Sequence, residues 1–198
     1  MNRIMLDLET LGNGSNAVIT SIGAVEFIPE HGKIGQRFSI DVDPQSCKDL
    51  GLDMDVSAVL WWMKQSDKAR AHFGRAKTSI STALLKFSKF VDNISPSNPE
   101  DVEIWGNGAA FDNVILSNAY KAAQVARPWS YSNDRCFRTL RAMYPNVPQD
   151  DIGISHCAVD DAEYQARLLM KIFCEMRGES QVRKTQRWGL KYWMESKQ

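Results

Sequence analysis

The sequence contains no long apolar stretch and no paired cysteine pattern. No uncharged apolar run approaches the roughly 20 residues that span a bilayer, and acidic residues at positions 7 and 9 interrupt the N-terminus before a secretory signal could form. Without a Cys-x-x-Cys pair, the sequence argues against a disulfide framework and against a structural zinc site. These absences predict a cytoplasmic protein that does not enter a membrane. The scattered cysteines are Cys47, Cys136, Cys157 and Cys174.

The chain also lacks net charge at pH 7, because 24 Lys and Arg residues balance 24 Asp and Glu residues. Proteins that bind long tracts of nucleic acid are usually basic, since contacts to phosphate supply much of their affinity. A neutral chain therefore argues against tight binding to an extended duplex, but it is compatible with an enzyme that holds a few nucleotides at a strand end. Local basic groups are either solvated faces or phosphate sites; they stand at positions 135, 138 and 141 and at 183, 184 and 187.

The 198 residues suit a single domain with its own core, and no internal repeat interrupts them. Apolar runs broken by turn residues predict strands over 3–9, 17–28, 34–42 and 102–106, with a strand or loop at 130–136. Apolar residues at helical spacing predict helices over 55–65, 67–73, 79–94, 111–125, 136–144 and 159–177. This order predicts an α/β fold with a mixed β-sheet flanked by helices.

Two carboxylates, Asp7 and Glu9, close the first predicted strand. Residues i and i+2 of a strand point to the same face, so both side chains project together. Two adjacent anions repel each other, and burial increases the repulsion. Because Mg²⁺ is usually held by one or two carboxylates and by substrate phosphates, a divalent cation is the expected partner of this pair. A solvated strand end is the alternative.

Two later segments carry residues of the same chemistry. Asp112 follows the fourth predicted strand and a glycine-containing turn, at the start of the helix over 111–125. His156 and Asp161 are five residues apart where a loop leads into the helix over 159–177, so both can face one site. Taken singly, each aspartate could instead cap its helix, and the histidine could be a packed or surface imidazole.

Together the three segments resemble the three motifs of the DEDDh family of 3′–5′ exonucleases, which have an RNase H-like fold. Asp7 to Thr10 is similar to the Asp-x-Glu-Thr motif, Asn107 to Asp112 to the Asn-x-x-x-Phe-Asp pattern, and His156 to Ala162 to the His-x-Ala-x-Asp-Asp-Ala motif. The resemblance covers residues 3–175. The segment at 57–70, which contains Trp-Trp, is similar to the small single-domain exonucleases of phages and bacteria.

The resemblance implies hydrolysis of phosphodiester bonds at the 3′ end of single-stranded nucleic acid, with release of nucleoside 5′-monophosphates and with DNA favoured over RNA. His156 would be the general base, since an ordinary histidine pKa of about 6.5 suits neutral pH. Asp160 is not expected among the metal ligands, because the five-residue spacing from the histidine belongs to Asp161. The implied ligands of two Mg²⁺ or Mn²⁺ ions are Asp7, Glu9, Asp112 and Asp161.

Trp61 and Trp62 are adjacent on a predicted helix and therefore point about 100° apart. One is expected in the core, and the other could stack on a base, for which Trp61 is the candidate; burial of both against the sheet is the alternative. By the resemblance, Leu11 would wedge between the terminal bases. The further substrate contacts that the resemblance implies are backbone groups of Thr10, Leu11 and Gly12, and Asn107.

Residues 1–178 are expected to form the exonuclease domain, and residues 179–198 a helical or irregular tail. The tail contains aromatic residues, which either pack back on the core or contact a partner subunit in a homodimer. These aromatic residues are Trp188, Tyr192 and Trp193.

Other functions compete with this interpretation. An exoribonuclease is the nearest alternative, since no motif reports a contact to the 2′-OH. A protein that binds nucleic acid ends without cleaving them, or assists proofreading, would not need all five catalytic positions to be filled. A cysteine hydrolase would pair Cys157 or Cys136 with a histidine, but Cys157 adjoins His156 in the sequence, and neighbouring residues rarely point at each other. The spaced acidic loop of an EF-hand is absent from the sequence.

Overall fold

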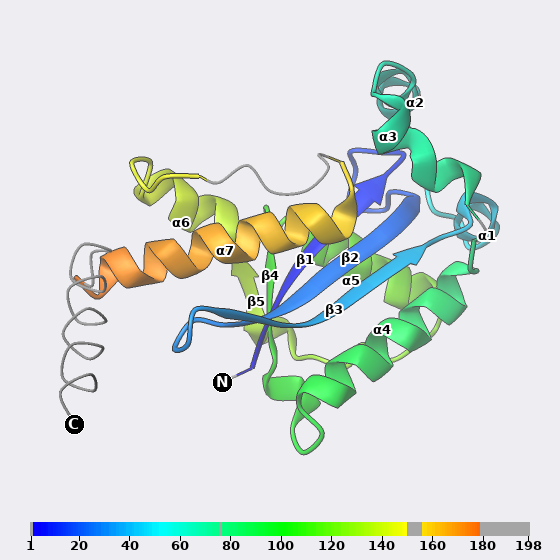
Figure 1. The fold of residues 1–198 in the computed structure, drawn as a ribbon. Helices are drawn as coiled ribbons and strands as arrows, with labels where there is room; N and C mark the ends of the chain where they lie inside the picture. The colour runs from blue at the N-terminus through cyan, green and yellow to red at the C-terminus, as the bar shows by residue number, and fades with distance from the viewer. Residues whose placement is uncertain (1, 76, 150–155, 179–198) are drawn as a thin grey trace, which may run out of the picture.

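A five-stranded mixed sheet forms the centre of the computed structural model, which describes residues 2–75, 77–149 and 156–178 (Figure 1). The strands are β1 (Arg3–Thr10), β2 (Ile19–Ile28), β3 (Lys33–Asp41), β4 (Glu103–Gly106) and β5 (Asp134–Cys136). In the order β3-β2-β1-β4-β5, β1 is antiparallel to β2 and parallel to β4. β3 is antiparallel to β2, and β5 is parallel to β4. The predicted mixed sheet is confirmed.

Helices cover both faces of this sheet (Figure 1). The α-helices are α1 (Pro44–Asp49), α2 (Val56–Met63), α3 (Asp67–Arg70), α4 (Ile80–Ile94), α5 (Asp112–Ala122), α6 (Phe137–Met143) and α7 (Ala158–Met176). The 3₁₀-helices are η1 (Ala71–Gly74), η2 (Pro99–Asp101) and η3 (Tyr131–Asn133). α4 and α5 pack on one face of the sheet, and α6 and α7 on the other.

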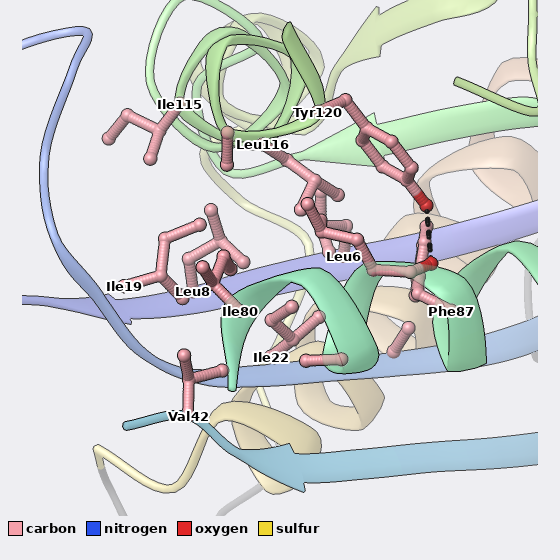
Figure 2. Packing of buried hydrophobic residues seen from close by; sticks show 14 of the residues in the cluster. Leu6, Leu8, Ile19, Ile22, Val42, Ile80, Phe87, Ile115, Leu116 and Tyr120 are labelled. Carbon is pink, nitrogen blue, oxygen red and sulfur yellow. Dashed lines mark hydrogen bonds between the residues drawn. The ribbon is translucent and has the colours of Figure 1, made fainter. Parts of the chain in front are cut away.

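The core between the sheet and helices α4 and α5 fixes the start of α5 relative to β1. Leu6 of β1 packs in one cluster with Phe87 of α4 and Leu116 of α5 (Figure 2). The Tyr120 hydroxyl, at the far end of α5, donates a hydrogen bond to the Leu84 carbonyl oxygen at 2.9 Å (Figure 2). Burial of such apolar side chains stabilises the fold by roughly 1.5–3 kcal/mol each.

The strand period separates core residues from functional ones along β1. Leu6 and Leu8 belong to the core under α4 and α5, whereas Met5 packs in the cluster under α7. Because alternate side chains share a face, Asp7 and Glu9 lie on the same face as Met5 and point toward α7. The sheet therefore directs both carboxylates to one side.

Two glycines let helices approach β1 closely. Gly23 of β2 pairs with Asp7, and a Cβ at Gly23 would lie 2.1 Å from the carbonyl carbon of Ala158, the first residue of α7. Gly106 of β4 pairs with Leu6, and a Cβ there would lie 2.3 Å from the Asn113 side-chain oxygen at the start of α5. Only glycine permits both approaches, so these positions bring the first turns of α5 and α7 to the carboxylates.

Some predicted boundaries differ from the structure. The helix predicted over 111–125 ends at Ala122, because Gln124 has a φ of +54°, which stops the helix. The helix predicted over 67–73 divides into α3 and η1. α1 has no counterpart among the predicted helices, although the Asp43 carboxylate caps it by accepting from the Gln45 N–H.

Residues 150–155 of the loop before His156 and the tail at 179–198 lie outside the described residues. The domain boundary at 178 and the homodimer therefore stay predictions. Within the described ranges, no helix combines the length and the apolar character that crossing a membrane requires.

Candidate active site

The two carboxylates of β1 face the first turns of α7. The Gln165 side-chain amide donates a hydrogen bond to Asp7 Oδ1 at 2.7 Å. Glu9 is 7% exposed, an unusual degree of burial for a glutamate. A buried anion needs a compensating charge, so this position calls for a cation or a bound proton.

Asp112 adds a third carboxylate from the first residue of α5. It is 3% exposed, and its Oδ1 accepts a hydrogen bond from the Leu8 backbone N–H at 3.3 Å, which ties it to β1. Its Oδ2 is also buried, and none of the residues that the structure describes gives it a hydrogen-bond partner. A buried carboxylate oxygen without a partner is costly in free energy, and a cation would satisfy it.

Asp161 and His156 complete the group at the start of α7. The His156 backbone N–H donates to Asp161 Oδ2 at 2.8 Å, which fixes the two residues relative to each other. His156 has a φ of +64°, a conformation that non-glycine residues rarely adopt and that is concentrated at functional sites. Ligand atoms of Glu9, His156 and Asp161 all lie within 4.8 Å of one another. Asp160, by contrast, forms an ion pair with Arg37 at 3.1 Å.

When no cation compensates the carboxylates, burial and mutual repulsion favour their protonated forms. Burial, followed by the charges of Asp112, Glu9 and Asp161, raises the pKa of Asp7 well above its ordinary value. Burial and then the charges of Asp161 and Asp112 raise the pKa of Glu9 to about 8. Burial also raises the pKa of Asp112 to about 7 and that of Asp161 above its ordinary value. A divalent cation that binds here would displace these protons.

A hard divalent cation fits this donor set. The carboxylate oxygens are the ligands that Mg²⁺ and Mn²⁺ prefer, and the Asp112 Oδ2 is buried without a partner among the described residues. Glu9 and Asp161 would repel each other strongly at this distance if both were ionised without a cation between them. The residues present therefore match the metal site that the motifs predict.

Two tryptophan side chains lie beside the carboxylates. Trp62 is 4% exposed, and its indole N–H donates to the Thr10 carbonyl oxygen at 2.8 Å, which holds the end of β1. Trp61 is 44% exposed, and its ring centroid lies 4.9 Å from that of His156 in an edge-to-face arrangement. The structure thus distinguishes the two tryptophans: Trp62 is the core residue, and Trp61 is the one that a ligand can reach.

A cavity of about 410 Å³ opens between α2 and the end of β1. Its volume lies in the range of small-molecule binding sites. Of the residues with a predicted substrate contact, Thr10 and Trp61 line it, whereas Leu11, Gly12 and Asn107 do not. The cavity is lined by Leu8, Glu9, Thr10, Asn13, Ser57, Ala58, Trp61, Trp62 and Phe111.

The loop after β1 is held by its own backbone. The Leu11 N–H donates to the Val18 carbonyl oxygen at 2.9 Å, and its carbonyl oxygen accepts from the Asp55 N–H at 2.8 Å. The Leu11 side chain packs in part against the core. A substrate contact from Leu11 would therefore come from its side chain.

Comparison with known proteins identifies the family of the chain. A family model described as "3'-5' exoribonuclease Rv2179c-like domain" matches residues 2–173. The chain belongs to this family. The exodeoxyribonuclease of Enterobacteria phage T4 is 26% identical over 131 residues, which cover 61% of this chain and 56% of the phage protein. The chain thus spans about half the length of this curated relative.

Solved structures with the same fold include two exonucleases. The nuclease domain of 3'hExo, described as a DEDDh family member bound to rAMP, has a TM-score of 0.60 at 14% identity and covers 88% of this chain and 92% of that one. A zinc-bound complex of E. coli exonuclease I with single-stranded DNA has a TM-score of 0.59 at 15% identity, over 89% of this chain and 40% of that one. These likenesses confirm the predicted RNase H-like fold, and the family match agrees with the predicted resemblance to 3′–5′ exonucleases.

Three residues of this family member contribute to the site without being identified from the motifs. Gln165 binds Asp7, and it stands four residues after Asp161, on the same face of α7, which is a signal that sequence carries. Gly23 acts by letting α7 approach closely, and Trp62 acts through the hydrogen bond from its indole N–H to the Thr10 carbonyl oxygen. Sequence spacing reveals neither contact.

The Cys157 form of the cysteine hydrolase alternative receives no support from the site. Burial is the largest influence on the Cys157 thiol and raises its pKa above the ordinary value. A raised pKa disfavours the thiolate that such an enzyme needs as nucleophile.

Proposed function

We propose that this protein is a metal-dependent 3′–5′ exonuclease that removes nucleoside 5′-monophosphates from single-stranded nucleic acid. Two observations on the site carry the proposal. Ligand atoms of Glu9, Asp161 and His156 lie within 4.8 Å of one another, and the buried Asp112 Oδ2 has no hydrogen-bond partner among the described residues. The family match, which names a 3′–5′ exoribonuclease domain, supports the same reaction class.

The carboxylates would hold two divalent cations, Mg²⁺ or Mn²⁺. When bound, such ions stabilise the charge on the phosphoryl oxygens and make water a nucleophile near neutral pH. Asp112 is tied to β1 through Leu8, and Asp7 is held by Gln165, so the ligands are preorganised by the fold.

His156 would accept the proton of the attacking water. Its backbone N–H is bound to Asp161, and its ring lies against Trp61, so the imidazole is held beside Glu9. Histidine is the side chain that most often acts as a general base near neutral pH.

The terminal nucleoside would occupy the cavity between α2 and β1. Glu9 lines this cavity, so a nucleoside bound there has its phosphate next to the carboxylates. The exposed ring of Trp61 provides a stacking surface, for which base–aromatic contacts contribute about 1–3 kcal/mol. In this proposal Thr10 contacts the sugar, and Leu11, Gly12 and Asn107 contact the strand outside the cavity.

The choice between DNA and RNA as substrate needs an experiment. The family description names RNA and the phage relative DNA, while the E. coli structure contains single-stranded DNA. DNA stays the predicted preference, with RNA as the alternative.

The test is a gel time course with matched DNA and RNA oligonucleotides labelled at the 5′ end. A ladder that shortens one nucleotide at a time, requires Mg²⁺ or Mn²⁺ and is absent with Asp7→Ala is the expected result. Binding of both strands without any shortening would contradict the proposal and favour the non-catalytic, end-binding function. Sedimentation of the full chain at several concentrations tests the predicted homodimer separately.

A further inference from the structure

Arg138, near the start of α6, is held beside the turn that carries Asp112. Its Nη2 donates to the Asn107 carbonyl oxygen at 2.6 Å. Its guanidinium also lies against Gly108, since a Cβ built on that glycine would be 3.4 Å from the Arg138 Cζ. Gly108 has a φ of +118°, which favours glycine, so the turn both requires this residue and leaves room for the guanidinium. The fold therefore fixes a cation at the edge of the carboxylate cluster.

The charge of Arg138 is available to a ligand. Within the described residues it forms no ion pair, whereas Arg135 pairs with Glu103 at 3.1 Å. Its side chain is exposed. Burial dominates the pKa of Asp112 and raises it, while Arg138 is a positive side chain that opposes the rise. Once cations compensate Asp112, the guanidinium retains its charge and its remaining N–H donors.

Arg138 does not line the cavity that we propose for the terminal nucleoside. That cavity lies between α2 and the end of β1, whereas Arg138 lies beside the turn at Asn107 and Gly108. A strand with its last nucleoside in the cavity and its scissile phosphate at the carboxylates must leave in another direction. We take one such route to pass the turn at Asn107 and Gly108, where the Arg138 guanidinium is bound to the Asn107 carbonyl oxygen.

A second exit is bordered by cations of a different kind. Lys68 and Arg75 line a cavity of about 240 Å³ that also touches Glu9. Arg75 is already ion-paired with Asp41, and Lys68 is an exposed side chain on the short helix α3. The exit past Arg138 is therefore the one where an uncompensated guanidinium is held in place.

We propose that Arg138 binds the first phosphate on the 5′ side of the scissile phosphate. This inference rests on the proposed function, because it takes the carboxylates as the position of the scissile group. The contact would be a charge-assisted hydrogen bond from the guanidinium to the non-bridging oxygens, the pairing for which arginine geometry is suited. Arg138 is then a positioning residue for the strand and does not touch the reacting atoms.

The test compares two substrates in Arg138→Gln. A short single-stranded DNA oligonucleotide has the neighbouring phosphate, whereas the p-nitrophenyl ester of thymidine 5′-monophosphate has only the scissile one. We expect KM for the oligonucleotide to rise about tenfold, the effect of one charged hydrogen bond, with kcat unchanged. The slope of log KM against log salt should fall by about 0.7, as for one phosphate contact on a single strand. Hydrolysis of the ester should not change.

The matched controls are Lys121→Gln, which removes an exposed charge at the end of α5, and Lys68→Gln, which probes the second exit. Equal losses on both substrates, unchanged oligonucleotide KM, or a salt effect in Lys68→Gln instead would each overturn the proposal. If Arg138→Gln melts below the assay temperature, Arg138→Lys replaces it. That variant should keep the wild-type slope of log KM against log salt and should have a higher KM.

Failure of the proposed function would be visible separately. In that case the wild-type protein cleaves neither substrate. Binding of a fluorescent oligonucleotide, measured by anisotropy with Ca²⁺, then still decides whether Arg138 contacts the strand: weaker binding in Arg138→Gln than in Lys121→Gln supports the contact, and equal binding refutes it.

Discussion

Replacement of Gly23 by alanine tests how the fold brings α7 to the metal ligands. The added Cβ would lie 2.1 Å from Ala158 C, 2.2 Å from Val159 N and 2.4 Å from Ala158 O, all of them backbone atoms. A flexible side chain could rotate away from such a clash, but the backbone of a helix cannot. The first turn of α7 must therefore move away from β2.

The size of the movement follows from the contact distances. Ordinary van der Waals contact begins at 3.4 Å, so the turn must shift by about 1 Å if α7 alone gives way. Overpacking of this kind typically costs about 1–3 kcal/mol of stability. His156 and Asp161 move with the turn, and a misplacement of about 1 Å in a catalytic group can cost roughly 10²-fold in rate.

The assay is the initial rate of oligonucleotide hydrolysis with saturating Mg²⁺, measured well below the melting temperature of each variant. Gly74→Ala is the control, because a Cβ there meets nothing within 4 Å. We expect Gly23→Ala to lose about 10²-fold in rate and to melt at a lower temperature, and Gly74→Ala to keep the wild-type rate. A Gly23→Ala protein with the wild-type rate would refute the argument that close approach of α7 sets the site.

Further predictions concern single residues of the site. Asp112→Ala should abolish hydrolysis and weaken Mn²⁺ binding in calorimetry; a near wild-type rate would remove it from the ligand set. His156→Ala should cost about 10²–10⁴-fold in rate at unchanged metal affinity, as loss of a general base does, and an equal loss of metal binding would make it a ligand. The Glu9 pKa is raised to about 8, so its contribution to stability is complete below the unfolded-state pKa of about 4.3 and is lost as pH rises through 8. The melting temperature in EDTA should therefore fall between pH 5 and pH 8, and it should fall less in Glu9→Gln or when Mg²⁺ is present. A wild-type melting temperature that does not change with pH would argue against the raised pKa of Glu9. Trp61→Ala should raise KM by about 5- to 100-fold through loss of base stacking, and Trp61→Phe should restore most of it.

The sequence predicts the positions of the carboxylates better than the contacts that support them. Asp7 and Glu9 could be assigned to one face because the strand period is fixed, and the resemblance to the exonuclease motifs implied that Asp112 and Asp161 join them. The consequence of Gly23 could not be predicted, since a glycine within a strand does not reveal which helix will pack over it. Close approach is a property of the tertiary structure.

The two tryptophans illustrate the same limit. Helical spacing places Trp61 and Trp62 on different faces, but it does not say which face is buried. The structure decides this through the Trp62 N–H bond to the Thr10 carbonyl oxygen and the exposure of Trp61. The short helix α1 went unpredicted because its six residues provide too little periodicity, although Asp43 and Pro44 give a cap signal.

In the proposed mechanism the four carboxylates hold two catalytic cations. The most direct measurement is a titration of the metal-free protein with Mn²⁺, followed by calorimetry, with the hydrolysis rate recorded at each step. We expect two ions per chain, a rate that rises with occupancy from zero in EDTA, and loss of both signals in Asp7→Ala. Hydrolysis at the full rate in EDTA, or wild-type Mn²⁺ binding by Asp7→Ala, would contradict it.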